Sequence, residues 1–265
     1  MKDDVGVGAR PSSGTGRDTS GSPWLTLQPT GARRPQVRVV CFPPAGGGSA
    51  SYAPFLGAAG RWVECYTVEM PGRASRVADR PALSVLEAAR EIAAAVRTTV
   101  ATGRTPYVLL GQCLGAVVAY EVAVELEFLG VRMPLRLVAA GSNGPRRAAP
   151  SVRDPLEFLR MGGGVPAELF DHPELLRMTL STLNADLEIV HAYRPRSHAI
   201  GAPITVLSGV DDPVVDEEGL ACWEGLSSVG LEAERVPGGH FFLEAHCPAL
   251  VARLRREAAA ATGTG

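Results

Sequence analysis

The chain has 265 residues and a net charge of -2, and its 46% hydrophobic and 20% charged residues are ordinary for a globular protein. This length suits one large α/β domain or two small ones. A nearly neutral charge balance argues against general nucleic-acid binding, which needs a basic face to neutralise phosphates. No apolar run reaches the roughly 20 residues of a membrane span. We therefore expect no nucleic-acid partner from the charge and no membrane partner from the apolar runs.

The five cysteines are scattered along the chain, at Cys41, Cys65, Cys113, Cys222 and Cys247. Their odd number and the lack of Cys-x-x-Cys spacing indicate neither a disulfide framework nor a zinc site. His246 stands beside Cys247, but two adjacent residues cannot both point inward from a helix, so we expect no metal. A reduced, cytoplasmic setting is the natural expectation.

The two ends of the chain are expected to lack order. Residues 1–35 are rich in Gly, Ser, Thr, Arg and Pro and hold few large apolar residues apart from Trp24 and Leu25. Such a segment buries too little surface to offset its ordering entropy, which predicts a disordered tail. Residues 259–265 are expected to fray.

Between the ends, short apolar runs alternate with helical patterns, and several runs are apolar on both faces, as buried parallel strands are. The predicted strands are residues 37–42, 63–70, 107–110, 135–140, 204–208 and 231–236. One predicted helix opens at Ser84, where Glu87 completes a capping box. Two others cover about 116–129 and 249–260. This alternation predicts an α/β fold whose mainly parallel sheet has helices on both faces.

The stretch from 145 to 195 interrupts the alternation because it contains no convincing strand. Apolar residues recur there at helical spacing, at Leu176, Leu180, Leu183, Leu187 and Val190. Two interpretations stay open for this helical insertion. Its helices either extend the core or form a lid over an active site, since insertions at the carboxyl ends of parallel strands commonly gate access.

A nucleophile motif follows the third predicted strand, in the run Gly111-Gln112-Cys113-Leu114-Gly115. A strand, a tight turn and a helix in this order form the context of the nucleophile elbow G-x-S-x-G, here with cysteine in the serine position. We expect side chains at the two glycine positions to collide with neighbouring backbone. The N-terminus of the following helix favours a thiolate. Taken alone, the motif is also compatible with a buried core cysteine.

Two later motifs complete the chain order nucleophile, acid, histidine. The strand at 204–208 runs into Gly209-Val210-Asp211-Asp212-Pro213, where Asp212 is the favoured acid and Asp211 the alternative. After the last strand, His240 follows two glycines on a turn from which it can reach the nucleophile. We therefore predict Cys113, His240 and Asp212 as catalytic residues. Three histidines lack such a context: His172, His191 and His198.

An oxyanion hole requires two fixed backbone N–H groups. One should belong to Leu114, directly after the nucleophile. The second is expected in the loop after the first strand, Phe42-Pro43-Pro44-Ala45-Gly46-Gly47-Gly48, and Ala45 is the predicted donor. The glycines let this backbone approach a substrate closely. A phosphate-binding loop is not indicated, because the run has no lysine and no Gly-Lys-Ser/Thr ending.

Together these motifs resemble those of the type II thioesterases that serve polyketide synthases and non-ribosomal peptide synthetases. The resemblance covers about residues 37–254 and rests on Cys41-Phe42-Pro43-Pro44-Ala45-Gly46-Gly47, Met70-Pro71-Gly72-Arg73, the elbow, and residues 187–195, 209–213 and 238–242. It implies an α/β-hydrolase fold over residues 36–258, with a lid at about 145–195. It also implies a cytoplasmic enzyme that needs no metal or organic cofactor. The implied substrates are acyl or aminoacyl groups on the phosphopantetheine arm of an acyl or peptidyl carrier protein.

The elbow departs from the family's usual Gly-His-Ser-Met-Gly at Gln112 and Cys113. A related group of carrier-to-carrier acyltransferases, similar in fold to thioesterases, also has cysteine here. Three functions therefore stay open: hydrolysis of carrier-bound thioesters, which family frequency favours; transfer of the acyl group to another carrier, amine or hydroxyl; and non-catalytic carrier binding. A complete triad argues against the last. Two interpretations also stay open for a group of arginines in the predicted lid, which either dock an acidic carrier protein or form a solvated face. They are Arg146, Arg147, Arg153 and Arg160.

Overall fold

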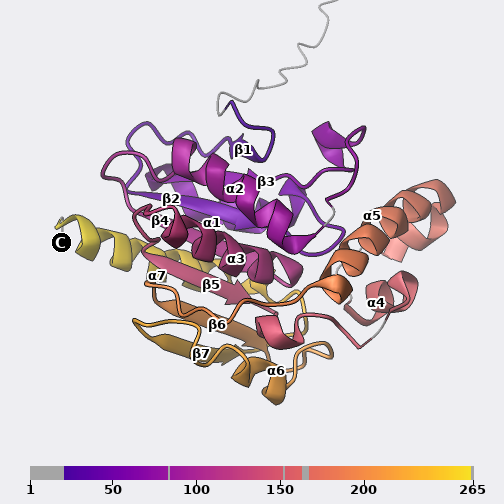
Figure 1. Ribbon diagram of the computed structural model, residues 1–265. Helices are drawn as coiled ribbons and strands as arrows, with labels where there is room; N and C mark the ends of the chain where they lie inside the picture. The colour runs from indigo at the N-terminus through magenta and orange to yellow at the C-terminus, as the bar shows by residue number, and fades with distance from the viewer. Residues whose placement is uncertain (1–20, 83, 152, 163–166, 264–265) are drawn as a thin grey trace, which may run out of the picture.

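The structure is a computed structural model that describes residues 21–82, 84–151, 153–162 and 167–263 (Figure 1). The described residues form a seven-stranded sheet of order β1-β3-β2-β4-β5-β6-β7, in which every pairing is parallel except that of β1 with β3. The strands are β1 (Leu25–Gln28), β2 (Val37–Phe42), β3 (Val63–Val68), β4 (Tyr107–Gln112), β5 (Arg136–Ala140), β6 (Ile204–Gly209) and β7 (Leu231–Val236). The predicted, mainly parallel sheet is confirmed.

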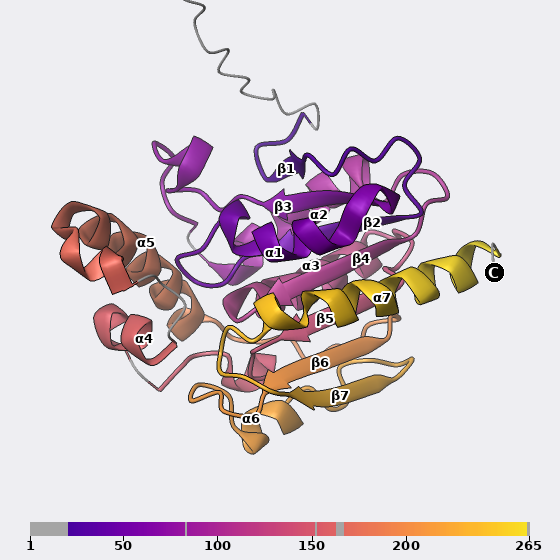
Figure 2. The same cartoon turned by 180° about the vertical axis from the view of Figure 1, so that it is seen from behind.

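Helices cover both faces of this sheet, as the sequence predicted (Figures 1 and 2). The α-helices are α1 (Ala53–Ala59), α2 (Val85–Thr99), α3 (Leu114–Phe128), α4 (Pro155–Gly162), α5 (Pro173–Ala192), α6 (Glu217–Ala221) and α7 (Leu243–Thr262). Short 3-10 helices are η1 (Ser49–Tyr52), η2 (Gly60–Trp62), η3 (Ala74–Arg76), η4 (Pro145–Arg147) and η5 (Ala167–Asp171). Helices α2 and α3 pack on one face and α1 and α7 on the other, which gives two apolar cores separated by the sheet.

The prediction of a disordered tail over residues 1–35 is wrong for β1, while residues 1–20 lie outside the described part of the chain. Leu25 pairs with Val68 and is fully buried. The Arg76 guanidinium lies 4.3 Å from the centre of the Trp24 ring. The few apolar residues of this segment therefore find enough surface to bury, because β3 offers it an open edge.

The last helix is longer at both ends than the predicted 249–260. It begins at Leu243, with Pro248 inside it, and continues to Thr262. Proline in a helix interior removes a hydrogen bond and usually ends the helix. Packing of Cys247, Leu250 and Leu254 against the sheet keeps α7 continuous. The expected fraying from residue 259 is corrected, since the helix continues through that point.

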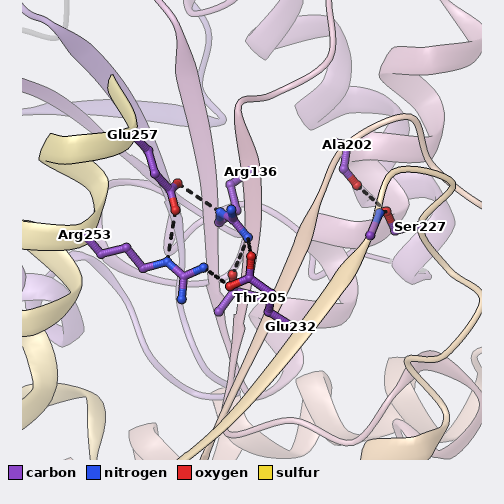
Figure 3. A network of polar contacts seen from close by, with 8 residues as sticks. Arg136, Ala202, Thr205, Ser227, Glu232, Arg253 and Glu257 are labelled. Carbon is purple, nitrogen blue, oxygen red and sulfur yellow. Dashed lines mark hydrogen bonds and ion pairs between the residues drawn. The ribbon is translucent and has the colours of Figure 1, made fainter. Parts of the chain in front are cut away.

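A network of charged side chains ties α7 to the amino ends of three strands (Figure 3). Arg136 of β5 donates to Glu257 of α7 at 2.9 Å and to Thr205 of β6 at 2.7 Å. Arg253 of α7 contacts Glu232 of β7 and Glu257, the latter at 3.0 Å. We refer to Arg136, Glu232, Arg253 and Glu257 as the amino-edge cluster.

At the opposite edge, α4 and α5 lie beyond the carboxyl ends of the strands (Figures 1 and 2). The described residues between 145 and 195 contain helices and no strand. The carboxyl-terminal half of α5 is the packed half, since Leu183, Leu187 and Val190 are buried. Near its other end, Leu175 and Met178 are exposed. Helix α5 is therefore anchored beside the sheet edge and projects away from it.

Candidate active site

The backbone at Cys113 adopts a conformation that side chains rarely take, with φ 53° and ψ −123°. Cys113 stands between the last residue of β4 and the first residue of α3, and its N–H donates to the Ala140 carbonyl at 2.9 Å. A Cβ on Gly111 would lie 2.4 Å from Cα of Ala116, and one on Gly115 would lie 2.0 Å from the Phe42 carbonyl oxygen. Only glycine fits at either place, so both glycines are required for a turn that presents Cys113 at the end of β4.

His240 and Asp212 come together from the loops that follow β7 and β6. Nδ1 of His240 lies 2.9 Å and 3.1 Å from the two carboxylate oxygens of Asp212, and both side chains are fully buried. Oδ1 of Asp212 also accepts from the backbone N–H of Val214 at 2.8 Å. Asp211, the alternative acid, is exposed. The contact that orients the histidine is therefore made by Asp212.

The electrostatic surroundings of His240 favour its protonated form. Burial acts to lower its pKa, but the negative charge of Cys113 and the hydrogen bond to Asp212 outweigh it and raise the pKa to about 10. Nε2 is buried and has no hydrogen-bond partner among the described residues. Cys113, whose charge and side-chain hydrogen bond both act to raise the histidine pKa, is the nearby group with which this ring interacts.

Two aromatic rings enclose the imidazole. Phe241 meets it edge-on with ring centres 5.1 Å apart, and Phe158 of α4 does so at 6.3 Å. Through Phe158, the segment predicted as a lid contributes directly to the surroundings of His240. These rings help to shield the imidazole from solvent, and the His240 side chain is fully buried.

Both predicted oxyanion donors line the same cavity as Cys113. Its lining includes Ala45 and Leu114 together with Leu187 and Val190 of α5. The lining contains no charged side chain. A second hollow adjoins it between the loop at 44–47 and the helices α4 and α5, and it shares Ala45 and Phe158 with the first. The Cys113 thiol and the two residues predicted as backbone donors therefore border one mainly apolar space.

Sequence reasoning missed one polar residue at this site, Asp186 of α5. Its carboxylate accepts from the Gly46 N–H at 2.7 Å and from Arg73 at 2.6 and 2.8 Å. A signal was present, because Asp186 stands three residues after Leu183 and one before Leu187, on the apolar side of the helix. An acid at such a position indicates a buried partner.

The remaining predicted positions do not line this cavity. His191 bonds to the Leu187 carbonyl at 2.7 Å, and His198 pairs with Glu127 at 2.5 Å. Arg147 is paired with Asp216 and Glu218.

Within the described residues, no cluster of three or more His, Cys, Asp or Glu could hold a metal ion, and no helix is long and apolar enough to cross a bilayer.

A mainly parallel sheet with a nucleophile turn, an acid and a histidine on successive loops at its carboxyl edge defines the α/β-hydrolase fold. Residues 37–257 match the model of the thioesterase domain, so the chain belongs to this family. The family indicated by the sequence motifs is thereby confirmed.

Similar proteins include enzymes named for biosynthetic pathways. A probable cadicidin biosynthesis thioesterase of Streptomyces griseus is 30% identical over 249 residues, which cover 91% of this chain and 67% of that protein. AMB antimetabolite synthetase AmbE of Pseudomonas aeruginosa is 31% identical over 89% of this chain, which spans only 11% of that much longer protein. The solved structure of the type II thioesterase BorB from the borrelidin biosynthetic cluster has a TM-score of 0.77 and 27% identity, covering 89% of this chain and 97% of BorB.

Proposed function

We propose that this protein is a thioester hydrolase that releases acyl or aminoacyl groups from the phosphopantetheine arm of acyl or peptidyl carrier proteins, through an acyl-enzyme on Cys113. The observation that carries the proposal is the strained turn at Cys113 beside the buried pair of His240 and Asp212. Membership of the thioesterase family and the pathway names of the relatives support the same reaction and a role in polyketide or non-ribosomal peptide biosynthesis.

In the first half-reaction, the Cys113 thiolate attacks the carbonyl carbon of the carrier thioester. Negative charge develops on the carbonyl oxygen, where the N–H groups of Ala45 and Leu114 stabilise it. The bond to the carrier sulfur then breaks, and the leaving thiolate takes a proton from Nε2 of the protonated His240. Asp212 keeps Nδ1 protonated and stabilises the imidazolium before this transfer.

Acylation itself converts His240 from an acid into a base. The negative charge of Cys113 is one of the causes that raise the histidine pKa, and this charge is lost when the thiolate becomes a thioester. A neutral imidazole can then take a proton from water as that water attacks the acyl carbonyl. The products are the free acid and the Cys113 thiolate paired again with a protonated His240.

Acyl transfer to a second carrier, an amine or a hydroxyl is the alternative, and the identity of the nucleophile favours it. A serine ester discards the group-transfer potential of the incoming thioester, whereas a cysteine thioester retains it. Exchange between Cys113 and carrier thiols is therefore nearly thermoneutral. In both reactions α4 and α5 would act as a lid, a role supported by Phe158, Leu187 and Val190 at the cavity.

The fate of the acyl group distinguishes the two reactions. Wild-type enzyme and Cys113→Ser are each mixed with a carrier loaded with labelled propionyl and with an equal amount of unloaded carrier. For a hydrolase we expect free propionate as the main product and appreciable hydrolysis by the serine variant. Rapid exchange between carriers with negligible acid release, together with a serine variant that stalls as a stable ester, would replace hydrolysis by transfer.

A cytoplasmic location is part of the same proposal. All five cysteines are free, including Cys41 and Cys65, whose sulfur atoms lie 3.6 Å apart on neighbouring strands. Free thiols this close together are typical of a reducing compartment.

A further inference from the structure

Three segments that are distant in sequence meet at Asp186, on the side of α5 that faces the sheet edge. Its side chain is only 5% exposed and accepts two hydrogen bonds from Arg73, which follows β3. It also accepts one from the Gly46 N–H, in the loop that follows β2. Arg73 donates in addition to the Gly47 carbonyl at 3.0 Å. The pair is therefore bonded to both residues that directly follow Ala45.

These bonds fix the orientation of the peptide groups beside Ala45. Gly46 has a left-handed conformation with φ +72°, and the Gly47 N–H closes a turn onto the Pro44 carbonyl at 2.9 Å. Such a turn can rotate its peptide groups at little cost, because glycine permits many conformations. With Gly46 and Gly47 held by Asp186 and Arg73, the direction of the Ala45 N–H is restricted as well.

The loop is also packed against α5 itself. A Cβ on Gly46 would lie 3.3 Å from Cβ of Leu183, one turn of helix before Leu187. Leu187 lines the cavity that contains Cys113. One face of one helix thus contacts both the oxyanion loop and the space expected to hold the acyl group.

We propose that Arg73 and Asp186 are positioning residues, which orient the Ala45 N–H as an oxyanion donor and make that donor depend on the docked position of α5. This role rests on the proposed acyl transfer to Cys113. When α5 moves away, Asp186 withdraws its acceptor from the Gly46 N–H and the loop loses its fixed conformation. The oxyanion hole is then complete only while the lid covers the site.

A merely structural ion pair would behave differently. A buried pair that only stabilises the fold affects every property of the site through loss of order. A pair that orients one donor affects only reactions that develop charge on a carbonyl oxygen. Alkylation of Cys113 by iodoacetamide displaces iodide at a saturated carbon and makes no such oxyanion, so its rate reports on the thiolate and His240 without reporting on Ala45.

The test compares these two rates in Asp186→Asn. The amide keeps the shape of the carboxylate but turns an N–H₂ group toward Arg73 or Gly46, both of which are donors. We expect the rate constant for Cys113 acylation by propionyl-loaded carrier to fall by about 10- to 100-fold, somewhat less than for complete loss of an oxyanion donor. The rate of Cys113 alkylation and the carrier concentration that half-saturates single-turnover acylation should stay within about twofold of wild type, since neither depends on the direction of one N–H group.

Two further variants make the comparison decisive. Arg73→Lys keeps the positive charge but cannot reproduce the bidentate contact of the guanidinium with both Asp186 oxygens, so it should show the same selective loss to a smaller degree. Glu64→Gln removes one charge from the Arg38–Glu64 pair at the amino edge of the sheet and should change neither rate. Melting curves for all variants establish that they are folded.

Equal losses of acylation and alkylation in Asp186→Asn and Arg73→Lys would show an ordinary structural pair and overturn the proposal. Wild-type acylation in both variants would overturn the positioning role and leave the proposed function intact. Failure of wild-type enzyme to acylate Cys113 would instead refute both.

Discussion

Charged side chains gather at both edges of the sheet, in the amino-edge cluster and around His240 and Arg73 at the carboxyl edge. The two groups differ in whether their polar atoms all have partners. In the amino-edge cluster each of Arg136, Glu232, Arg253 and Glu257 has a partner of opposite charge, and the Glu232 side chain is 58% exposed. At the carboxyl edge the charged groups are buried, yet Nε2 of His240 and Nε of Arg73 have no hydrogen-bond partner among the described residues.

Whether polar groups are left without partners distinguishes a stabilising cluster from a functional site better than the number of charges does. A cluster that serves only stability gains most when all its donors and acceptors are satisfied. A site that acts on a substrate needs at least one polar group that is oriented but unoccupied. The predicted donors at Ala45 and Leu114 meet this description, since both residues line the cavity that contains Cys113.

The largest expected effect comes from removing the nucleophile or the base. Cys113→Ala should abolish acyl-enzyme formation, and His240→Ala should lower turnover of a loaded carrier on the order of 10³-fold, because the proposed acid for the leaving thiolate and base for the attacking water are both lost. Release of carrier thiol with time measures both. His172→Ala, an exposed histidine at the start of α5, serves as the control and should retain full activity. A His240→Ala variant with near-normal turnover would remove the base from the account.

The two neighbouring acids give the next largest contrast. Asp212→Asn should reduce turnover by roughly 100-fold, less than loss of His240, because a reactive thiolate depends less on the acid that orients its base. Asp211→Asn should leave turnover nearly unchanged, since Asp211 is exposed and the hydrogen bonds to His240 come from Asp212. A greater loss in Asp211→Asn would show that the acid has been misassigned.

The pH dependence of stability is a smaller effect with a definite sign. The pKa of His240 is raised from its ordinary value of 6.5 to about 10, so the folded state holds a proton that the unfolded state releases. The stability from this proton is fully present below about pH 6.5 and is lost as pH rises toward 10. In Cys113→Ala one cause of the raised pKa is gone, so less stability should be lost over this range. Denaturant unfolding at several pH values measures this loss of stability in wild type and in Cys113→Ala. The same measurement on His240→Ala gives the part of the pH dependence that does not come from this histidine.

The smallest effect is expected at the amino edge. Glu257→Gln removes a partner from both Arg136 and Arg253 and should lower the free energy of unfolding by about 0.5–1 kcal/mol, as partly exposed ion pairs do. Its acylation and alkylation rates should equal those of wild type. Loss of acylation without loss of stability in this variant would break the distinction between the two edges.

Much of the site follows from local sequence, because each of its motifs combines a strand end, a turn and a special residue. Gly111 and Gly115 indicated the tight turn at Cys113, and the structure shows the backbone that a Cβ at either position would strike. Asp212 could be preferred over Asp211 from its place in the turn, and it is Asp212 that contacts the histidine. These features depend on a few consecutive residues.

Features that depend on distant partners could not be predicted in the same way. The bonds from Asp186 to Gly46 and Arg73 join residues 140 and 113 positions apart, so no local pattern links them. Strand β1 was missed because its order comes from the open edge of β3 and not from its own composition. The continuity of α7 through Pro248 likewise comes from packing against the sheet.

The central claim is that Cys113 carries the acyl group, and intact-mass spectrometry with peptide mapping tests it most directly. Wild-type enzyme is mixed with propionyl-loaded carrier, quenched in acid within milliseconds to seconds, and digested. We expect a transient mass increase of one propionyl group, located on the peptide that contains Cys113, which appears before the product and is absent from Cys113→Ala. Product formation with no adduct on that peptide, or an adduct on another residue that persists in Cys113→Ala, would contradict the account.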